Sequence, residues 1–186
     1  MNCTQVGPLF CRPQPIIGGI SGLVVILLLT LTPMVSAQTG NIDTVDKWAW
    51  GTNAGWLNFR PSNGGAAVYS DHLEGFIWAE NAGWIRLGTF DGGGPHTYAN
   101  TSAADYGVNN DGTGLLSGYA WSTNTGWINF DPTGTEQVVI DLATKSFDGY
   151  AWAENLGWIH FKNASPAYNV VTTGDVPVEL QAFSVE

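Results

Sequence analysis

Large apolar residues alternate with small or polar residues in four short segments of the chain, and each segment has an Asn-x-Gly turn near its centre. The four segments align without gaps and lie at residues 47–59, 75–87, 118–130 and 149–161. Alternation with a period of two on both sides of a short Asn/Gly turn is typical of a β-hairpin. Four copies of this pattern in one chain predict a single β unit that is repeated and packed against its own copies.

All nine tryptophans belong to the repeat. Each segment has two of them, separated by five residues: Trp50 and Trp56, Trp78 and Trp84, Trp121 and Trp127, and Trp152 and Trp158. The ninth, Trp48, occupies the position that Phe76, Tyr119 and Tyr150 hold in the other segments. The repeat is therefore defined by aromatic residues at three fixed positions.

The length of the turn decides which side chains share a face of the hairpin. A three-residue loop places Glu80 opposite Trp84 and Trp78 opposite Arg86, and a five-residue loop gives the same faces. Both tryptophans then lie on one face, because residues opposite each other in an antiparallel pair point to the same side. A four-residue loop would separate them, since a slip of one residue reverses every side chain. The opposite face would carry Ala120, Ile128 and Phe130 and their equivalents.

A further strand-like segment precedes three of the hairpins, at residues 67–70, 107–110 and 137–140. The first hairpin has only a weak counterpart at 42–45, whereas an additional segment, 168–171, follows the last hairpin. We expect this C-terminal segment to complete the first unit and close the assembly. The alternative is that it completes the first unit of a neighbouring molecule, which would build filaments by strand addition.

These units predict an all-β domain, in which the four hairpins form an antiparallel barrel-like or sandwich assembly of roughly 11–12 strands. The longest interruption of the pattern, residues 88–106, is expected to be a loop on this scaffold. Loops of that length are often functional or disordered. The repeat domain is predicted to span residues 38–172, followed by an exposed tail at 173–186.

The first 37 residues have a different character. An apolar run at residues 16–35 leads into Val35-Ser36-Ala37, a small-residue site of the kind cleaved during export. We predict a signal peptide at residues 1–37, and hence a protein that is secreted or displayed at the cell surface. The alternative is an uncleaved anchor, because the run approaches the ~20 residues that span a membrane.

The cysteine content bears on how the exported chain is stabilised, and the net charge bears on its possible partners. Both cysteines, Cys3 and Cys11, lie in the predicted signal peptide, so the exported chain must be stabilised without disulfides. The formal net charge is −10, and all 16 acidic residues follow residue 37. Such a chain repels phosphate backbones and anionic lipids. Nucleic acid is therefore excluded as a partner, and contact with a membrane is expected only through the signal segment before cleavage.

The paired tryptophans are expected to form the core. Burying one indole removes about 200 Å² from water, which at about 25 cal/mol/Å² stabilises the fold by about 5 kcal/mol. The alternative is that one tryptophan of each repeat stays exposed and stacks on sugar rings or on another copy of the protein. The candidates for this glycan-stacking or self-association surface are the second tryptophans and the polar residues two positions later: Trp56, Trp84, Trp127, Trp158, Asn58, Arg86, Asn129 and His160.

Sequence motifs for catalysis are missing. The three histidines, His72, His96 and His160, have no spacing that is typical of a metal site, and His72-Leu-Glu74 is too short to indicate one. Glu80 and Glu154 recur at one turn position and suggest a glycosidase pair, but two of the four repeats carry threonine there. We therefore predict no catalytic residue, no metal and no cofactor.

The repeats Gly118-Tyr-Ala-Trp-Ser-Thr-Asn-Thr-Gly-Trp-Ile-Asn-Phe130 and Gly149-Tyr-Ala-Trp-Ala-Glu-Asn-Leu-Gly-Trp-Ile-His-Phe161 resemble those of uncharacterised exported bacterial surface proteins. The resemblance implies export and a repeat architecture. We expect a non-catalytic structural or adhesive protein of the cell surface or extracellular space. The alternatives are a carbohydrate-binding module that uses exposed tryptophans and a self-assembling extracellular filament subunit. The expected partners are accordingly polysaccharide or copies of the protein itself.

Overall fold

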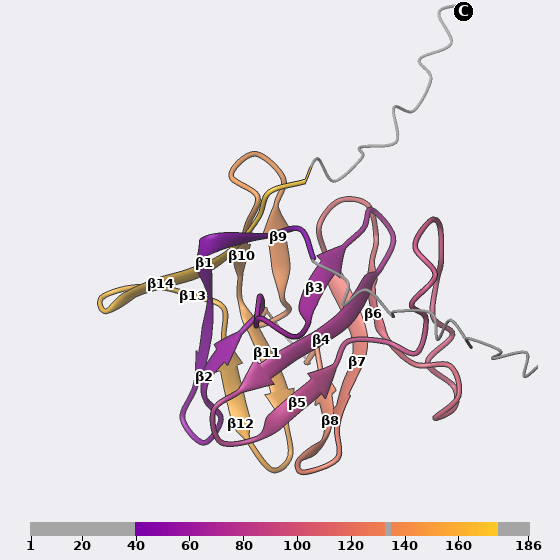
Figure 1. Ribbon diagram of the computed structural model, residues 1–186, viewed down its shortest axis with the longest axis horizontal. Coiled ribbons are helices and arrows are strands. Elements are labelled where there is room, and N and C mark those ends of the chain that lie inside the picture. Colours follow the sequence, from indigo (N-terminus) through magenta and orange to yellow (C-terminus); the bar gives the residue numbers. More distant parts are fainter. Residues whose placement is uncertain (1–39, 133–134, 175–186) are drawn as a thin grey trace, which may run out of the picture. The chain divides into compact units, whose positions relative to one another are not determined.

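The computed structural model describes residues 40–132 and 135–174, and every regular element in these residues is a β-strand (Figure 1). No helix in the described part of the chain is long and apolar enough to cross a membrane. The predicted signal peptide and nearly all of the predicted tail lie outside the described residues.

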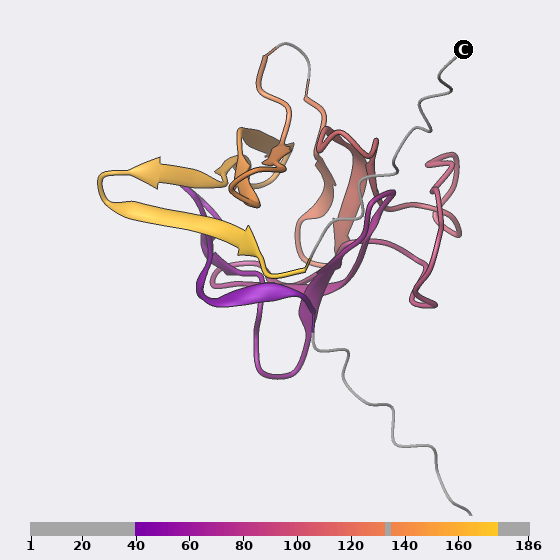
Figure 2. The same ribbon diagram turned by 90° about the horizontal axis from the view of Figure 1, so that it is seen from above.

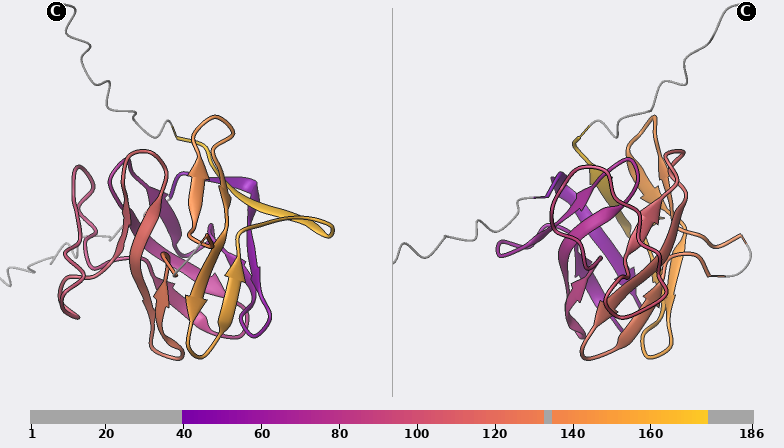
Figure 3. Two further views of the ribbon diagram at one scale, coloured as in Figure 1. Left: turned by 180° about the vertical axis from the view of Figure 1, so that it is seen from behind. Right: turned by 90° about the vertical axis from the view of Figure 1, so that its right-hand side faces the viewer.

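Four hairpins form a closed antiparallel barrel of eight strands, as the repeats predicted, but the described residues contain 14 strands in all rather than the expected 11–12. Each hairpin pairs with the next through β2–β4, β5–β7 and β8–β11, and β12 pairs with β1 to close the ring. The turns of the hairpins gather at one end of the barrel (Figures 1 and 3). The barrel strands are β1 (Ile42–Gly51), β2 (Gly55–Asn58), β4 (Leu73–Ala79), β5 (Gly83–Arg86), β7 (Leu116–Ser122), β8 (Gly126–Asn129), β11 (Tyr150–Ala153) and β12 (Gly157–His160).

A third strand lies beside the first strand of each hairpin. In the second and third units these are β3 (Gly65–Val68) and β6 (Val108–Asn110), which pair with β4 and β7. In the fourth unit β9 (Val139–Asp141) pairs with β10 (Ser146–Asp148), which leads directly into β11.

The first unit takes its third strand from the other end of the domain. The C-terminal strand β14 (Ala167–Thr172) pairs with β1, with Ile42 opposite Thr172 and Lys47 opposite Val170. This confirms the prediction that the C-terminal segment completes the first unit of its own chain. A short strand that the sequence did not predict, β13 (Lys162–Ala164), forms a hairpin with β14. Figure 2 shows this hairpin and the loop between β5 and β6 projecting from opposite sides of the barrel.

The hairpin loops have the preferred length of three residues, but each begins one residue earlier than predicted, so that Ala79 pairs with Gly83 across a loop of residues 80–82. Trp78 lies directly opposite Trp84, and Phe76 lies opposite Arg86. The predicted register, with Trp78 opposite Arg86, was therefore wrong by two residues. The predicted faces are nevertheless correct, because a shift of two residues restores the same side of a strand.

The barrel interior is filled by the face that lacks tryptophan. Phe161 contacts Phe59, Phe130 and Phe147, with ring centroids 5.6, 5.7 and 5.9 Å apart, and smaller aliphatic side chains fill the rest. An eight-stranded barrel is just wide enough for its inward side chains to fill. The inward residues of the hairpins include Ala49, Leu57, Phe59, Ile77, Ala79, Ile85, Leu87, Ala120, Ile128, Phe130, Ala151, Ala153, Ile159 and Phe161.

The prediction that the paired tryptophans form the core is wrong, because all eight lie on the outside of the barrel. Seven of them are 37–42% exposed, and the eighth, Trp121, is partly buried. An indole does not need complete burial to stabilise the fold. Each indole instead buries more than half of its surface against neighbouring outer rings, and this arrangement leaves the narrow interior to smaller residues.

The turn asparagines hold neighbouring hairpins together at the end of the barrel. The side-chain amide of Asn81 donates to the carbonyl of Asn53 at 3.2 Å, and that of Asn124 donates to Ala82 at 2.9 Å. Asn155 donates in the same way to the carbonyl of Thr125 at 3.0 Å. The repeated asparagine thus joins one hairpin to the previous one, a role beyond its suitability for turns.

Candidate functional site: an outer aromatic belt

The outward residues of the four hairpins form one continuous surface, which we call the aromatic belt. Cross-strand pairing places Tyr119 opposite Asn129, Asn129 opposite Trp152, and Trp152 opposite Trp158. The same order of aromatic, polar, tryptophan and tryptophan recurs at the other hairpin junctions. The belt consists of Trp48, Phe76, Tyr119, Tyr150, the eight paired tryptophans, and the polar residues Asn58, Arg86, Asn129 and His160.

Edge-to-face contacts between tryptophans fix the rings of the belt. The ring centroids are 5.2 Å apart in Trp78–Trp84, 4.6 Å in Trp121–Trp127 and 4.8 Å in Trp152–Trp158, all with steep interplanar angles. Such T-shaped pairs add about 0.5–1.5 kcal/mol to the effect of burial alone. The belt is therefore an ordered surface on which part of each indole remains accessible.

The structure brings all eight sequence-predicted site residues onto this belt. The tryptophans of the set are about equally accessible, with 37% of Trp56, 40% of Trp84, 42% of Trp127 and 41% of Trp158 exposed. Exposed aromatic surface on this scale is typical of binding or association surfaces.

The predicted polar residues are largely engaged within the chain. The side-chain oxygens of Asn58 and Asn129 accept the backbone N–H groups of Arg60 and Asp131, each at 2.9 Å. These bonds turn the chain as it leaves the barrel strand, and the asparagines are therefore first of all structural.

Arg86 is the charged member of the polar set. Its guanidinium donates to the carbonyl of Thr89 at 2.9 Å and to the carboxylate of Asp91 at 2.7 Å, and it lies 5.5 Å from the centre of the Phe76 ring. These contacts hold the start of the β5–β6 loop against the belt.

His160 is held between two tyrosines. Its ring stacks on Tyr150 at 4.2 Å, and its Nδ1 lies 3.1 Å from the hydroxyl of Tyr168 on β14. Burial lowers the pKa of His160 below the usual 6.5, so the ring is neutral at neutral pH. An uncharged, stacked imidazole suits a packing role better than proton transfer.

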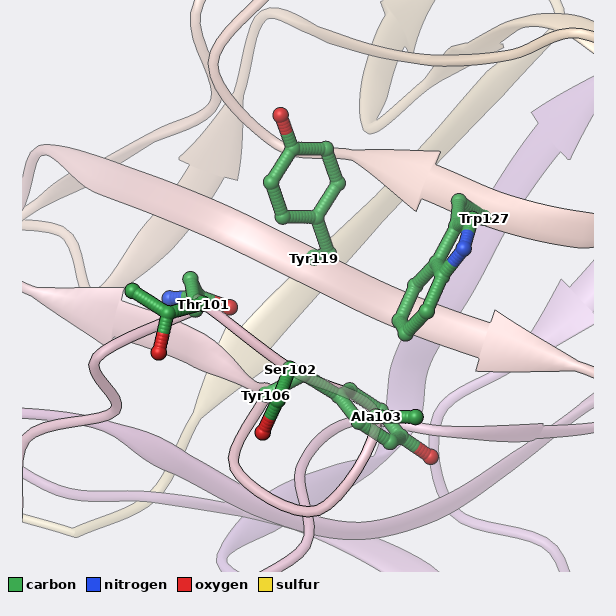
Figure 4. A pocket seen from close by; sticks show the side chains of 7 residues that line it. Thr101, Ser102, Ala103, Tyr106, Tyr119 and Trp127 are labelled. Carbon is green, nitrogen blue, oxygen red and sulfur yellow. The ribbon is translucent and has the colours of Figure 1, made fainter.

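A cavity of about 360 Å³ opens beside Trp127 (Figure 4). Trp127 and Tyr119 line it from the barrel, and Tyr106 and residues 100–103 line it from the β5–β6 loop. Tyr106 packs edge-on against Trp127, with ring centroids 4.8 Å apart. The loop that the sequence marked as the longest interruption thus builds one wall of a cavity on the belt.

A second cavity, of about 400 Å³, lies between the third and fourth hairpins. Trp127 and Tyr119 line it as well, together with Trp121, Thr125, Gly126, Asn129, Trp152, Glu154 and Asn155. Two cavities therefore share the same tyrosine and tryptophan.

Equivalent ring pairs border cavities in the first two units. Trp48 and Trp56 line one of about 430 Å³ with the β13–β14 hairpin, and Phe76 and Trp84 line one of about 200 Å³ with Asn63. Cavities on the belt therefore recur with the repeat, but the elements that wall them differ between units.

Sequence reasoning missed a cluster around His72, which is fully buried. Its Nδ1 lies 2.6 Å from the Asp71 carboxylate and its Nε2 lies 2.9 Å from that of Glu74. The carboxylates also accept the backbone N–H groups of His96 and Gly93, at 2.8 and 2.9 Å. This network fastens the β5–β6 loop to the outer face of β4. The signal in the sequence was that His72 and Glu74 continue the outward face of a strand with ionisable residues.

The His72 cluster is a structural feature, because substrate cannot reach a fully buried imidazole. Within residues 40–132 and 135–174, no group of three or more His, Cys, Asp or Glu side chains is placed to hold a metal ion. The belt itself offers accessible aromatic rings beside amides and hydroxyls.

No protein-family model matches the chain, and no curated protein or solved structure is significantly similar to it. The resemblance to exported surface proteins rests on the repeat motif alone and remains a prediction.

Proposed function

We propose that this protein is an exported, non-catalytic adhesive protein that binds polysaccharide through its aromatic belt. The observation that carries the proposal is the exposure of 37–42% for seven of the eight paired tryptophans. Of the expectations drawn from the sequence, the adhesive and carbohydrate-binding ones are thus combined in one activity. Residence at the cell surface or outside the cell is part of the proposal and follows from the predicted signal peptide.

The chemistry of the belt favours sugars over other partners. One face of a pyranose ring consists mainly of C–H groups, which pack on flat aromatic rings while the hydroxyl groups form hydrogen bonds at the edges. The belt supplies both, since amides, hydroxyls and the carboxylates of Asp46 and Glu154 line its cavities beside the indoles. The net charge of −10 disfavours phosphate-bearing and other strongly anionic partners.

Self-association is the competing function. Large exposed apolar surfaces also join copies of a protein. Filament formation by strand addition would require β14 to leave β1 and β10 of its own chain, to both of which it is paired in this structure. The pairing within one chain supports a monomeric binding protein over a strand-exchanged filament.

The proposal is tested with the exported chain, residues 38–186, and a panel of polysaccharides. Binding to insoluble cellulose and chitin is measured by depletion, and binding to soluble glucans, xylans and mannans by tryptophan fluorescence, with sedimentation to report self-association. Saturable binding to at least one glycan by a monomer is expected. A protein that binds no member of the panel and sediments as a concentration-dependent polymer would show that the belt joins copies of the chain instead.

A further inference from the structure

We propose that the third and fourth hairpins form a cleft for an uncharged or amino-substituted oligosaccharide of at least two sugar units, with the Trp127 ring dividing two adjacent subsites. This inference rests on the proposed function, which it deepens by assigning a site and a ligand class. It starts from the two cavities that both have Tyr119 and Trp127 in their walls.

The two cavities are of suitable size. At about 360 and 400 Å³, each falls in the range of roughly 300–1,000 Å³ that is typical of small-molecule sites. Because they share two residues, a linear ligand that fills one can continue past the indole into the other. A single sugar ring would occupy only one of them.

Trp127 is held in place before any ligand arrives. Tyr106, Tyr119 and Trp121 approach it edge-on, with ring centroids at 4.8, 6.0 and 4.6 Å. The ring nevertheless remains 42% exposed. A platform that is already ordered loses little conformational entropy on binding, and this favours affinity.

Groups able to bond to sugar hydroxyls line each subsite. In the first, Thr101 is exposed and forms no hydrogen bond among the described residues. In the second, the exposed Glu154 likewise has no hydrogen-bond partner within the described residues, whereas its equivalent Glu80 accepts the N–H of Trp56 at 3.3 Å. Glu154 is thus available to accept a bond from a ligand hydroxyl or amine.

The same carboxylate restricts the ligand class. Among the described residues, no cationic side chain lines either cavity, and Glu154 places a negative charge in the second. A uronic acid in that subsite would be repelled without a compensating partner. Neutral sugars and amino sugars fit this environment.

The test compares oligosaccharides of one to six units, from the β-1,4-glucose, β-1,4-glucosamine and α-1,4-galacturonate series, by calorimetry and tryptophan fluorescence. Affinity is expected to rise at least about tenfold between one and four units in the glucose or glucosamine series, as stacking at a second subsite allows. The galacturonate series is expected to bind at least about tenfold more weakly than the better of the other two. Equal affinity for one unit and four units would overturn the inference.

Two variants locate the site. Trp127→Ala is expected to remove the dependence on length, whereas Trp84→Ala, which truncates an equally exposed belt indole of another hairpin, should keep the roughly tenfold rise in affinity from one to four units. Ala103→Trp places a bulky ring in the first cavity from an exposed loop position and should reduce affinity for four units to that for one or two.

The two proposals fail in different ways. If the wild-type protein binds no glycan, the proposed function itself is wrong. If it binds glycans but Trp84→Ala and Trp127→Ala weaken binding equally, and Ala103→Trp has no effect, then the whole belt binds uniformly and the two-subsite cleft does not exist. Circular dichroism establishes that each variant is folded. If Trp127→Ala does not fold, the effect of Ala103→Trp on the affinity for four units decides whether the cleft exists.

Discussion

Replacing Gly118 by alanine should destabilise the protein far more than replacing Gly126, although both glycines belong to the same hairpin and both have positive φ, at 85° and 81°. Left-handed backbone costs an L-residue about 1–2 kcal/mol, and this strain applies equally to both variants. The difference comes from what the new methyl group meets.

At Gly126 the nearest atoms to an added Cβ are 3.9 Å away, which is ordinary van der Waals contact. At Gly118 the Cβ would lie 2.3 Å from the carbonyl oxygen of Gly107, which leads into β6. Relief requires β6 to move away from β7. That movement would break the hydrogen bond from Tyr119 to Gly107, worth about 1 kcal/mol, and disturb the fully buried Val108, worth about 1–2 kcal/mol. We expect a loss of about 1–2 kcal/mol for Gly126→Ala and about 3–5 kcal/mol for Gly118→Ala.

Urea unfolding, followed by far-UV circular dichroism and by tryptophan fluorescence, measures both losses. With a denaturant slope of about 2 kcal/mol/M, the midpoints of the two variants should differ by about 1 M. Coincident transitions from the two probes would establish two-state unfolding. Equal midpoints would refute the reasoning, because they would mean that the close approach of β6 is not what requires glycine at position 118.

Two further predictions concern the hairpin ends and the β5–β6 loop. Asn124→Ala should cost about 1 kcal/mol in urea unfolding through loss of the 2.9 Å bond to Ala82, whereas the exposed neighbour Thr123→Ala should stay within about 0.5 kcal/mol of wild type. Burial raises the pKa of Asp71, but hydrogen bonds from the His72 side chain and the His96 backbone outweigh it, so the net pKa lies below 3.8. A lowered folded-state pKa stabilises the protein above about pH 4 and ceases to do so as pH falls through the folded value. Midpoints of Asp71→Asn measured from pH 6 to 2.5 should therefore decline less than those of wild type; parallel curves would contradict this.

The hairpins, their shared faces and closure by the C-terminal strand could all be predicted from the sequence. They depend on local signals, namely alternation with a period of two and turns that contain Asn and Gly. The pairing of β14 with β1 followed from counting strand-like segments, since only the first unit lacked a partner. Periodicity separates the face of Trp127 from the face of Ile128, but it does not say which one lies inside.

The inward direction is decided by the closed barrel as a whole. An eight-stranded ring has room inside for Ala120, Ile128, Phe130 and their equivalents in the other hairpins. Eight indoles in their place would be too bulky for it. This limit is a property of the assembled barrel, so a reading of one hairpin at a time could not include it.

The candidate site was predictable only in part, because only some of its residues belong to the repeat. Trp127 and its equivalents recur in the repeat and were identified as candidates, whereas Tyr106 and Thr101 lie in a loop that occurs once. Their positions beside Trp127 depend on how the buried His72 network and the β5–β6 loop pack on β4. Such long-range loop contacts leave no periodic signal in the sequence.

Closure of the barrel by β1 has a consequence for how the chain matures. Strand β1 is synthesised before the other described strands, and it finds its partners β12 and β14 only after the remainder of the domain has been produced. Until then both edges of the growing sheet stay open to incorrect pairing. Delivery of the chain across a membrane in an unfolded form, with ring closure as the final event on the far side, would keep those edges away from other nascent proteins. Any truncation that ends before Gly157 should leave an open sheet prone to aggregation.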